Sequence, residues 1–390
     1  MTESPLLTTR LFSDPESSLL LQGQSLAPEP DRAVADLQSA MAGAELALVL
    51  FFCSSRFDLP RLAHCFRSRF AGTPLIGCTT AGEIGPAGYR DGSVAAIGFS
   101  AAGFSAASTA IGDLDAFDEL QAREMAGEMM RRVGRPAEQC FSILLIDGLS
   151  GREERVARQC QRALGNVALV GGSAGDDQCF VSTSLFHKGE FRDEALWLVI
   201  GTALAFKVYR SSHFVGCSEP LVVTEADAER RIVREINGYL AAEEYSRITG
   251  VPVAYLDPVS FAKAPFTVRI GGNDYVRSIR TVQDDGSLSL YCAIERGVVL
   301  RVAAGMDLAG VRRKLFEDLR RELGKPLGIV GFDCIHCRLE AENLDGKAAI
   351  EDMFRENRVV GFSSYGEQFV GTHVNQTFTG VAIGAARRHG

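Results

Sequence analysis

The sequence predicts an α/β (α+β) fold of mixed β-sheets flanked by helices, built from repeated strand-helix-strand-strand units, with an antiparallel insert. The first observation is a kernel that occurs three times: an apolar strand, Gly, a Ser or Thr, then Gly followed by an acid. The copies lie in residues 74–84, 168–177 and 359–384. A segment used three times in one chain is an architectural unit.

The second observation is that the same elements surround each kernel. Apolar runs precede the kernels at residues 47–53, 143–146 and 327–332. A helix is expected between run and kernel, around residues 59–70, 153–164 and 348–354, and a further apolar strand follows each kernel, at residues 94–99, 196–205 and 378–383. A strand-helix-strand step favours parallel pairing, and a short turn into the next strand favours an antiparallel neighbour. We therefore expect mixed sheets.

The third observation is a change of pattern in the middle of the chain. Residues 207–307 hold shorter strands with alternating charges, and the turn at 284–286 (Asp-Asp-Gly) is typical of a hairpin. A helix is expected over residues 239–247 and another from Asp307 to about Leu323. We predict an N-terminal segment over residues 1–28, a first domain with two repeat units over 29–205, and a second domain over 206–385 that joins the insert to the third unit.

Composition and charge narrow the class of protein. The chain has 390 residues, 46% of them hydrophobic, which fits a globular protein of two or three domains. A net charge of −8 argues against nonspecific nucleic-acid binding, which needs clustered Lys and Arg. No apolar run approaches the roughly 20 residues that span a bilayer, and no signal peptide is visible. We expect a cytoplasmic protein without membrane or nucleic-acid partners, whose ten cysteines are reduced thiols.

Several separated motifs resemble one family. The segments GCTTAGEI, GGSAGDD, LWLVIGT, INGYLAAEEY and the terminal GEQF…HVNQTFTGVAIG are similar, in this order, to the FIST sensory domain with its N- and C-terminal halves. The resemblance covers about residues 30–385. Phe-Asp-Cys at residues 332–334 and the full C-terminal motif are most similar to a stand-alone subgroup of haem-binding nitric-oxide sensors.

The resemblance implies a sensor rather than an enzyme. Such a sensor would bind haem b, take nitric oxide as its ligand, and regulate a separate histidine kinase or a cyclic-di-GMP synthase or phosphodiesterase. A homodimer is left open. The alternative is a haem-free FIST module that binds a small organic metabolite such as an amino acid.

Haem iron needs a side-chain ligand in an apolar pocket. Six histidines are available, and His373 is the first choice because it lies inside the segment of strongest resemblance. A structural histidine in a turn is the alternative for this residue. His336 is the second choice, at the end of an apolar run and two residues after Cys334.

The pair Cys334 and Cys337 has several interpretations. A structural zinc site would need two more ligands, and no second C-x-x-C occurs in the chain. Covalent c-type haem is disfavoured because Arg338 stands where that motif has His. A redox pair of thiols is chemically feasible. The favoured interpretation is that Cys334 is a buried strand residue and the pair is incidental.

The kernels themselves resemble two kinds of functional site. Residues 171–175 (GGSAG) match the G-x-S-x-G nucleophile elbow, but a strand rather than a helix is expected to follow Ser173. The Gly-rich turns also resemble phosphate loops, although no Lys follows them and an acid would repel phosphate. The favoured role of the acids is to accept hydrogen bonds from their own turns. In the metabolite alternative, the kernel residues would hold the ligand: Thr79, Glu83, Ser173, Asp176, Ser363 and Glu367.

Overall fold

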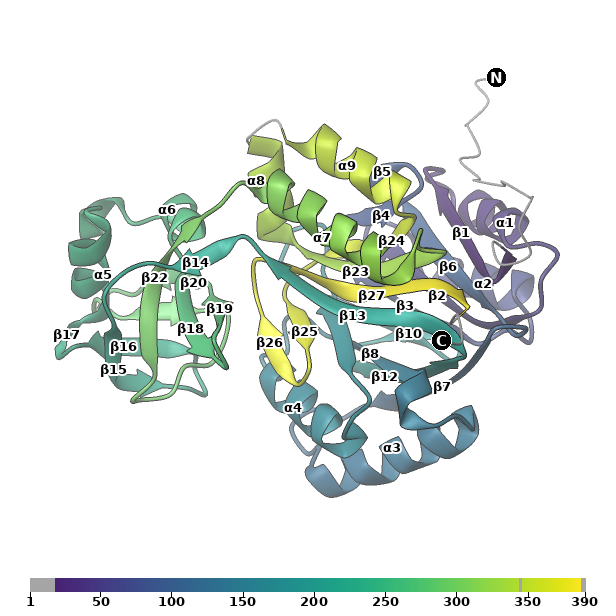
Figure 1. Ribbon diagram of the computed structural model, residues 1–390, viewed down its shortest axis with the longest axis horizontal. Coiled ribbons are helices and arrows are strands. Elements are labelled where there is room, and N and C mark those ends of the chain that lie inside the picture. The colour runs from purple at the N-terminus through teal and green to yellow at the C-terminus, as the bar shows by residue number, and fades with distance from the viewer. Residues whose placement is uncertain (1–17, 344–345, 387–390) are drawn as a thin grey trace. The chain divides into compact units, whose positions relative to one another are not determined.

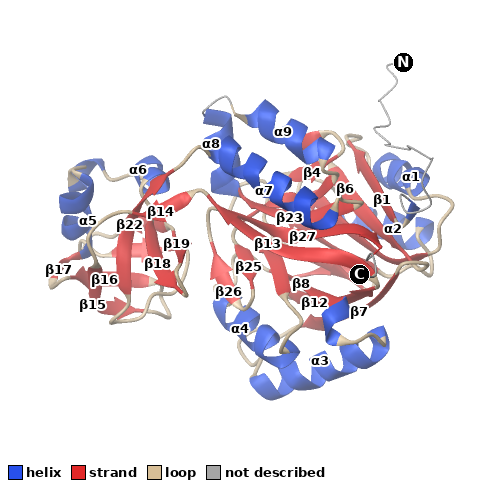
Figure 2. Cartoon of the chain, in the orientation of Figure 1, coloured by secondary structure: helices blue, strands red, loops and turns tan. Residues whose placement is uncertain are grey.

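The computed structural model describes residues 18–343 and 346–386, which form two units. Unit 1 contains the described residues up to Ser211, those of Arg312–Thr372, and those from Phe378 onward. Unit 2 contains Ser212–Val311 and His373–Thr377. The glycine-rich turns of all three kernels lie in unit 1, although His373–Thr377 of the third copy belong to unit 2. The third repeat unit thus groups mainly with the first two, and the insert forms most of unit 2. Figures 1 and 2 show the helices and strands.

Unit 1 is built on three six-stranded mixed sheets with the same plan. The first has the order β1 (Leu20–Ser25), β6 (Val94–Ser100), β2 (Leu46–Ser54), β3 (Leu75–Thr80), β10 (Leu185–His187) and β11 (Glu190–Arg192). The second has the order β7 (Phe104–Ile111), β12 (Ala195–Thr202), β8 (Cys140–Ile146), β9 (Leu169–Ser173), β25 (Glu367–Phe369) and β26 (Thr372–Val374). The third has the order β13 (Leu204–Ser212), β27 (Thr377–Ala386), β23 (Gly328–Cys334), β24 (Val359–Ser364), β4 (Glu83–Gly85) and β5 (Gly88–Arg90).

The predicted parallel step inside each repeat unit is confirmed, whereas the last strand of the unit does not lie beside the kernel strand as the predicted short turn implied. Each kernel strand runs parallel to the strand before its helix, as in the pairs β2–β3, β8–β9 and β23–β24. The strand that ends the unit runs antiparallel to that same first strand, as in β2–β6, β8–β12 and β23–β27. One element was not predicted. A two-stranded hairpin stands between the kernel and the last strand of every unit.

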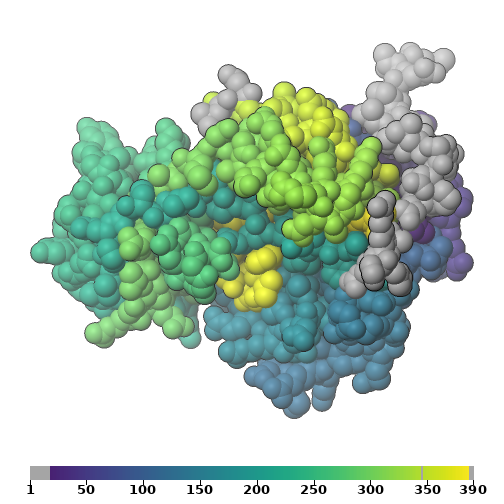
Figure 3. Space-filling view, viewed as in Figure 1, coloured from purple at the N-terminus to yellow at the C-terminus, as the bar shows by residue number. Residues whose placement is uncertain are grey.

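These hairpins are exchanged among the three sheets in a cycle. The hairpin of the first unit, β4–β5, pairs with β24 of the third sheet. The hairpin of the second unit, β10–β11, pairs with β3 of the first sheet. The third hairpin, β25–β26, joins the second sheet through β9, and its yellow tip reaches the surface in Figure 3. The strand that follows a unit also joins the next sheet. After the first unit, β7 pairs with β12 of the second sheet, and after the second unit, β13 lies beside β27 of the third sheet.

The first glycine of each kernel lets the two parallel strands approach closely. A Cβ atom at Gly361 would lie 1.6 Å from the carbonyl oxygen of Gly331, and one at Gly171 would lie 2.0 Å from that of Leu144. Any larger residue would force these strands apart. The recurring glycine in the sequence is therefore a packing requirement of the fold.

The inner faces of the three sheets share one apolar core. Phe52 of β2 lies 4.9 Å from Phe362 of β24 between ring centroids, and Phe362 lies 5.5 Å from Phe332 of β23. Both faces of the central strands are buried, which explains why they read as continuous apolar runs. The outer faces are covered by these helices: α1 (Pro30–Ala40), α2 (Leu59–Arg69), α3 (Glu119–Val133), α4 (Glu153–Leu164), α7 (Leu308–Leu323), α8 (Ile335–Asn343) and α9 (Lys347–Glu356).

Unit 2 holds a nine-stranded antiparallel sheet, so the predicted antiparallel insert is present. Its strands are β14 (Phe214–Gly216), β15 (Leu221–Asp227), β16 (Ile232–Ile236), β17 (Tyr239–Leu240), β18 (Phe266–Ile270), β19 (Asn273–Arg277), β20 (Ile279–Val282), β21 (Leu288–Leu290) and β22 (Val299–Gly305). Its helices are α5 (Ala241–Thr249) and α6 (Pro258–Lys263). The fold class is confirmed: mixed sheets flanked by helices.

Candidate functional site

The three kernels meet in the interior of unit 1. Ala81 donates its backbone N–H to the carbonyl of Ser363 at 3.0 Å, and Ser173 donates to the carbonyl of Gly366 at 2.8 Å. Gly175 donates to the carbonyl of Thr79 at 3.0 Å. The structure therefore brings the predicted kernel residues together through main-chain hydrogen bonds between the turns.

The side chains of the kernel residues are enclosed by protein. None is more than 3% exposed, which applies to Thr79, Glu83, Ser173, Asp176, Ser363 and Glu367. Glu83 accepts hydrogen bonds from the hydroxyls of Thr80 at 2.6 Å and Ser93 at 2.7 Å. Burial raises the pKa of Glu83 to about 8, against the pull of these hydrogen bonds. Glu367 accepts the equivalent hydrogen bond, from Ser364 at 2.5 Å.

Asp176 stabilises the loop that follows the second kernel through hydrogen bonds. Its carboxylate accepts hydrogen bonds from three consecutive backbone amides, of Phe180, Val181 and Ser182, at 2.7–2.9 Å, and from the hydroxyl of Tyr365. Burial favours the neutral acid, but the hydrogen bonds outweigh it and hold the pKa of Asp176 below its ordinary value. These contacts make the acids of the kernels part of the framework in the described conformation.

Ser173 does not have the geometry of a nucleophile elbow. It ends β9, its hydroxyl accepts a hydrogen bond from the side-chain amide of Gln368 at 2.9 Å, and its side chain is fully buried. Residues 174–184 contain no helix, whereas the elbow needs a sharp turn directly into one. This geometry gives no support to an acyl-transfer site at Ser173.

The two predicted haem ligands lie on different elements. His373 is on β26, is 2% exposed, and its backbone carbonyl accepts a hydrogen bond from Arg277 at 3.3 Å. His336 lies in the first turn of α8 rather than at the end of a strand, because β23 stops at Cys334. Burial lowers the pKa of His336. Neither histidine lines any of the three cavities described below, so these three cavities offer a haem iron neither of the predicted ligands.

The thiols of Cys334 and Cys337 are both buried. Cys334 is the last residue of β23, as the favoured interpretation expected, and Cys337 lies in α8. Burial raises the pKa of the Cys337 thiol well above its ordinary value. The ten cysteines, all within the described part of the chain, are free thiols, and the described residues hold no group of three or more His, Cys, Asp or Glu placed to bind a metal ion.

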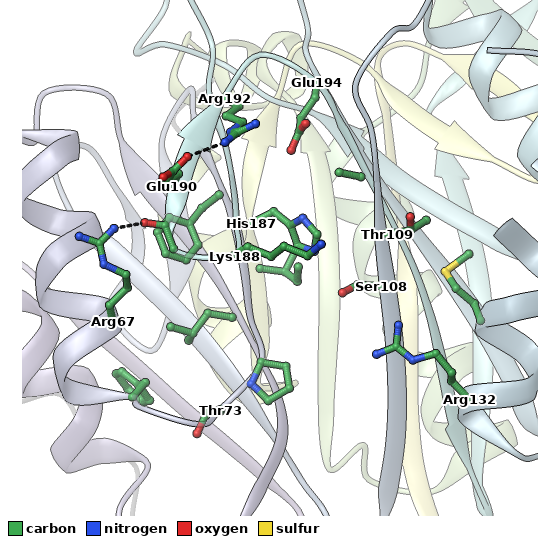
Figure 4. A pocket seen from close by; sticks show the side chains of 18 of the residues that line it. Arg67, Thr73, Ser108, Thr109, Arg132, His187, Lys188, Glu190, Arg192 and Glu194 are labelled. Carbon is green, nitrogen blue, oxygen red and sulfur yellow. Dashed lines mark hydrogen bonds and ion pairs between the residues drawn. The ribbon is translucent and has the colours of Figure 1, made fainter. Parts of the chain in front are cut away.

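One cavity is a groove that the sequence did not reveal. Its volume is about 1050 Å³, and it lies between the edges of the first and second sheets (Figure 4). One wall comes from the end of α2, the start of β3 and the β10–β11 hairpin, and the other comes from β7 and α3. Two smaller cavities measure about 640 Å³, beside the end of α1, and about 380 Å³, beside α5.

Charged side chains dominate this groove. Glu190 pairs with Arg192 at 2.6 Å, and Glu128 pairs with Arg131, which lies outside the groove, at 2.6 Å. The guanidinium of Arg67 donates to the backbone carbonyl of Gly189 in the hairpin turn. Three cations of the groove form no ion pair with a carboxylate among the described residues: Arg67, Arg132 and Lys188.

Glu194 is the buried polar group of the groove. It is 7% exposed, and no side-chain hydrogen bond or ion pair is formed by it within the described part of the chain. Burial raises its pKa, although Arg192 and Lys188 oppose the shift. Burial also lowers the pKa of His187, and Lys188 and Arg192 act in the same direction. The groove thus holds an acid with a raised pKa and a histidine with a lowered pKa.

The equivalent boundary between the third and first sheets is closed. The guanidinium of Arg358, the residue before β24, donates a hydrogen bond to the backbone carbonyl of Leu20 at 3.2 Å. The backbone carbonyl of Arg358 accepts a hydrogen bond from the side-chain amide of Gln22 at 2.6 Å. Gln24 accepts from the backbone amide of Ala87, in the turn of the β4–β5 hairpin, at 2.9 Å. Long polar side chains therefore bridge β1 to its neighbouring sheet.

Shorter residues occupy these positions at the groove. The register of the repeat units places Pro74 at the position of Arg358, Ser108 at that of Gln22, and Ala110 at that of Gln24. All three shorter residues line the groove. Their length explains why this boundary stays open. The only sequence signal of the groove is the charged turn at residues 186–194 (FHKGEFRDE), which is also typical of a solvated hairpin.

Comparison with known protein families identifies both halves of the chain. The model of the FIST N domain matches residues 47–239, and that of the FIST C domain matches residues 241–370. Comparison with curated proteins gave no significant match. No helix in the described residues is both long and apolar enough to cross a bilayer. The groove and two of the three kernels fall within the FIST N match.

Proposed function

Because the chain belongs to the FIST-domain proteins, whose domains suggest a small-molecule sensor, we propose that it senses a small polar organic metabolite. The output is a change in the activity of a separate signalling protein, such as a histidine kinase or a cyclic-di-GMP synthase or phosphodiesterase. No catalytic step is assigned to the chain.

The groove is the observation that carries this proposal. Its volume of about 1050 Å³ is just above the range for small-molecule sites, about 300–1000 Å³. Its lining combines charged side chains with the hydroxyls of Thr73, Ser108 and Thr109. Such a lining favours a polar metabolite over an apolar macrocycle.

A sensor also needs two states that bind the ligand differently. The β10–β11 hairpin is the element suited to this. It forms the edge of the first sheet, and β11 pairs only with β10. A ligand held between this hairpin and α3 would favour one position of the hairpin, and a partner protein could read that position.

The prediction of haem b and nitric oxide rests on the family resemblance, and the geometry around His373 and His336 adds nothing to it. An absorption spectrum of the protein expressed with added haem, before and after anaerobic nitric oxide, tests it directly. A Soret band at about one haem per chain that shifts with nitric oxide would support haem sensing. Loss of that band in His373→Ala would then identify the ligand.

The metabolite proposal is tested by thermal unfolding with a panel of amino acids, dicarboxylates and sugar phosphates. A ligand at 100 times its Kd stabilises a protein by about 2.7 kcal/mol, which gives a measurable rise in Tm. Hydrogen exchange of residues 185–192 with the stabilising compound then tests for a conformational response. If no compound of the panel stabilises the protein while haem binds stoichiometrically, the metabolite proposal is wrong.

A further inference from the structure

We propose that the groove binds a small organic dianion, with Arg132 and Arg67 on opposite walls each receiving one acidic group and Lys188 lying between them. This inference rests on the proposed function and names the class of ligand. It comes from the charges of the groove and from the way its two walls are built.

The two arginines come from separate elements. Arg67 is in the last turn of α2 and Arg132 is in the last turn of α3, and Figure 4 shows them on opposite sides of the groove. Arg67 uses one terminal nitrogen for the carbonyl of Gly189, which leaves its other N–H groups for a ligand. Arg132 extends from its helix toward the middle of the groove, where Lys188 lies on the hairpin.

The balance of charge favours an anion. The groove holds four carboxylates and four permanent cations. Glu190 is neutralised by Arg192, and Glu128 by Arg131 outside the groove, so two carboxylates remain against Arg67, Arg132 and Lys188. One of these two carboxylates, Glu194, is buried, which favours its neutral form. A guanidinium matches a carboxylate or phosphate with two parallel hydrogen bonds, so each arginine suits one acidic group.

Glu194 can complete this arrangement in its protonated form, which has an O–H group that donates to an anionic oxygen. The hydroxyls of Ser108 and Thr109 on β7 lie on the same side of the groove as Arg132. A monoanion would leave one arginine without a partner, and a diamine would face three cations.

The experiment is calorimetric titration of the full chain at low salt with succinate, glutarate and adipate. Butyrate, 4-aminobutyrate and cadaverine serve as the monoanion, the zwitterion and the dication of similar length. We expect at least one dicarboxylate to bind at least about tenfold more tightly than all three controls. Because the contacts are between charges, affinity should fall as salt is added.

Variants locate the binding. Arg132→Gln and Arg67→Gln should each weaken the dicarboxylate at least about tenfold. Arg123→Gln is the control, because Arg123 lies on the same helix and pairs with Glu119, and both residues lie outside the groove. It should leave the Kd unchanged within twofold. Circular dichroism and Tm of each variant show whether the fold is intact. If Arg67→Gln unfolds the hairpin, the comparison of Arg132→Gln with its control variant alone tests the inference.

Three results would overturn the inference: no dicarboxylate binds, the zwitterion or the diamine binds as tightly, or Arg132→Gln binds like wild type. None of them contradicts a metabolite sensor. That proposal fails if no compound of the wider panel stabilises the protein while haem binds stoichiometrically, so the two failures are distinguishable.

Discussion

The boundary between the first and second sheets is open, whereas the boundary between the third and first sheets is closed, although equivalent strands form both. At the closed boundary Arg358, Gln22 and Gln24 reach across and hydrogen-bond to main-chain groups. At the open boundary Pro74, Ser108 and Ala110 stand in the same places and reach no further than their own strands.

This difference shows how a repeated fold can acquire a binding site. Because the units repeat, the backbone forms similar boundaries between the sheets. The length of a few side chains, rather than the backbone, determines which boundary is open to a ligand. A boundary bridged by long polar side chains holds the fold together, and one lined with short side chains leaves room for a ligand.

The largest expected effect comes from closing the groove. The triple variant Pro74→Arg, Ser108→Gln and Ala110→Gln copies the closed boundary onto the open one. It should reduce the affinity for the groove ligand at least about a hundredfold, which corresponds to about 2.7 kcal/mol. Titration calorimetry measures this. Ser108→Ala, which adds no length, is the control and should bind within a few-fold of wild type. A triple variant that binds normally would place the ligand elsewhere.

The opposite change weakens the closed boundary. Arg358→Ala removes the hydrogen bond to the carbonyl of Leu20 and leaves a space where the partly buried guanidinium lay. Loss of a partly buried hydrogen bond from a charged donor costs about 1–3 kcal/mol. Urea unfolding should show this loss while groove affinity stays constant. Arg355→Ala, which breaks partly exposed ion pairs on α9, should cost less than about 1 kcal/mol. Equal losses would remove the structural role assigned to Arg358.

A smaller loss of stability is expected at the hairpin of the closed boundary. Gln24→Ala leaves the buried amide of Ala87 without its acceptor, at a cost of about 1 kcal/mol. Hydrogen exchange of the Ala87 amide should also become faster, because that amide is no longer protected. Gln38→Ala, an exposed glutamine on α1, is the control for both measurements. Unchanged exchange at Ala87 would contradict the bridging role of Gln24.

The smallest expected effect is a dependence of binding on pH. Burial raises the pKa of Glu194 above its ordinary value of 4.5, and binding of a dianion favours the protonated acid. A dicarboxylate also takes up a proton in this range, so the affinity is calculated for the dianionic form of the ligand. This affinity should rise by a few-fold as pH falls toward that value. His187, with a lowered pKa, gains charge in the same direction, and Arg192 and Lys188 stay charged throughout. Glu194→Gln should flatten the pH profile of the affinity, and His187→Gln should flatten the remainder. An affinity for the dianion that rises with pH would contradict the role of Glu194.

Much of the fold could be predicted from the sequence because its units are local. The helix over residues 153–164 matches α4, and the expected helices near residues 348–354 and 308–323 correspond to α9 and α7. The exchange of hairpins could not be predicted. A three-residue strand such as β4 carries no information about its partner, and its pairing with β24 joins residues far apart in the chain.

The candidate site was harder to predict for the same reason. The kernel residues could be recognised because their pattern recurs in the sequence. This pattern recurs because two strands approach each other closely at Gly171 and at Gly361. The groove takes its walls from residues 67–76, 108–132 and 186–194, none of which forms a motif by itself. Repetition in a sequence reveals what the copies share, whereas this groove lies where they differ.

The cyclic exchange of hairpins makes the three repeat units depend on one another. A single repeat unit, taken alone, has one sheet without its edge hairpin and one hairpin without a sheet. Three such repeat units complete one another in a closed cycle, as the subunits of a trimer with exchanged hairpins would. Because one polypeptide carries all three, the sequence of each boundary can differ, so one can open to a ligand while another keeps the assembly intact.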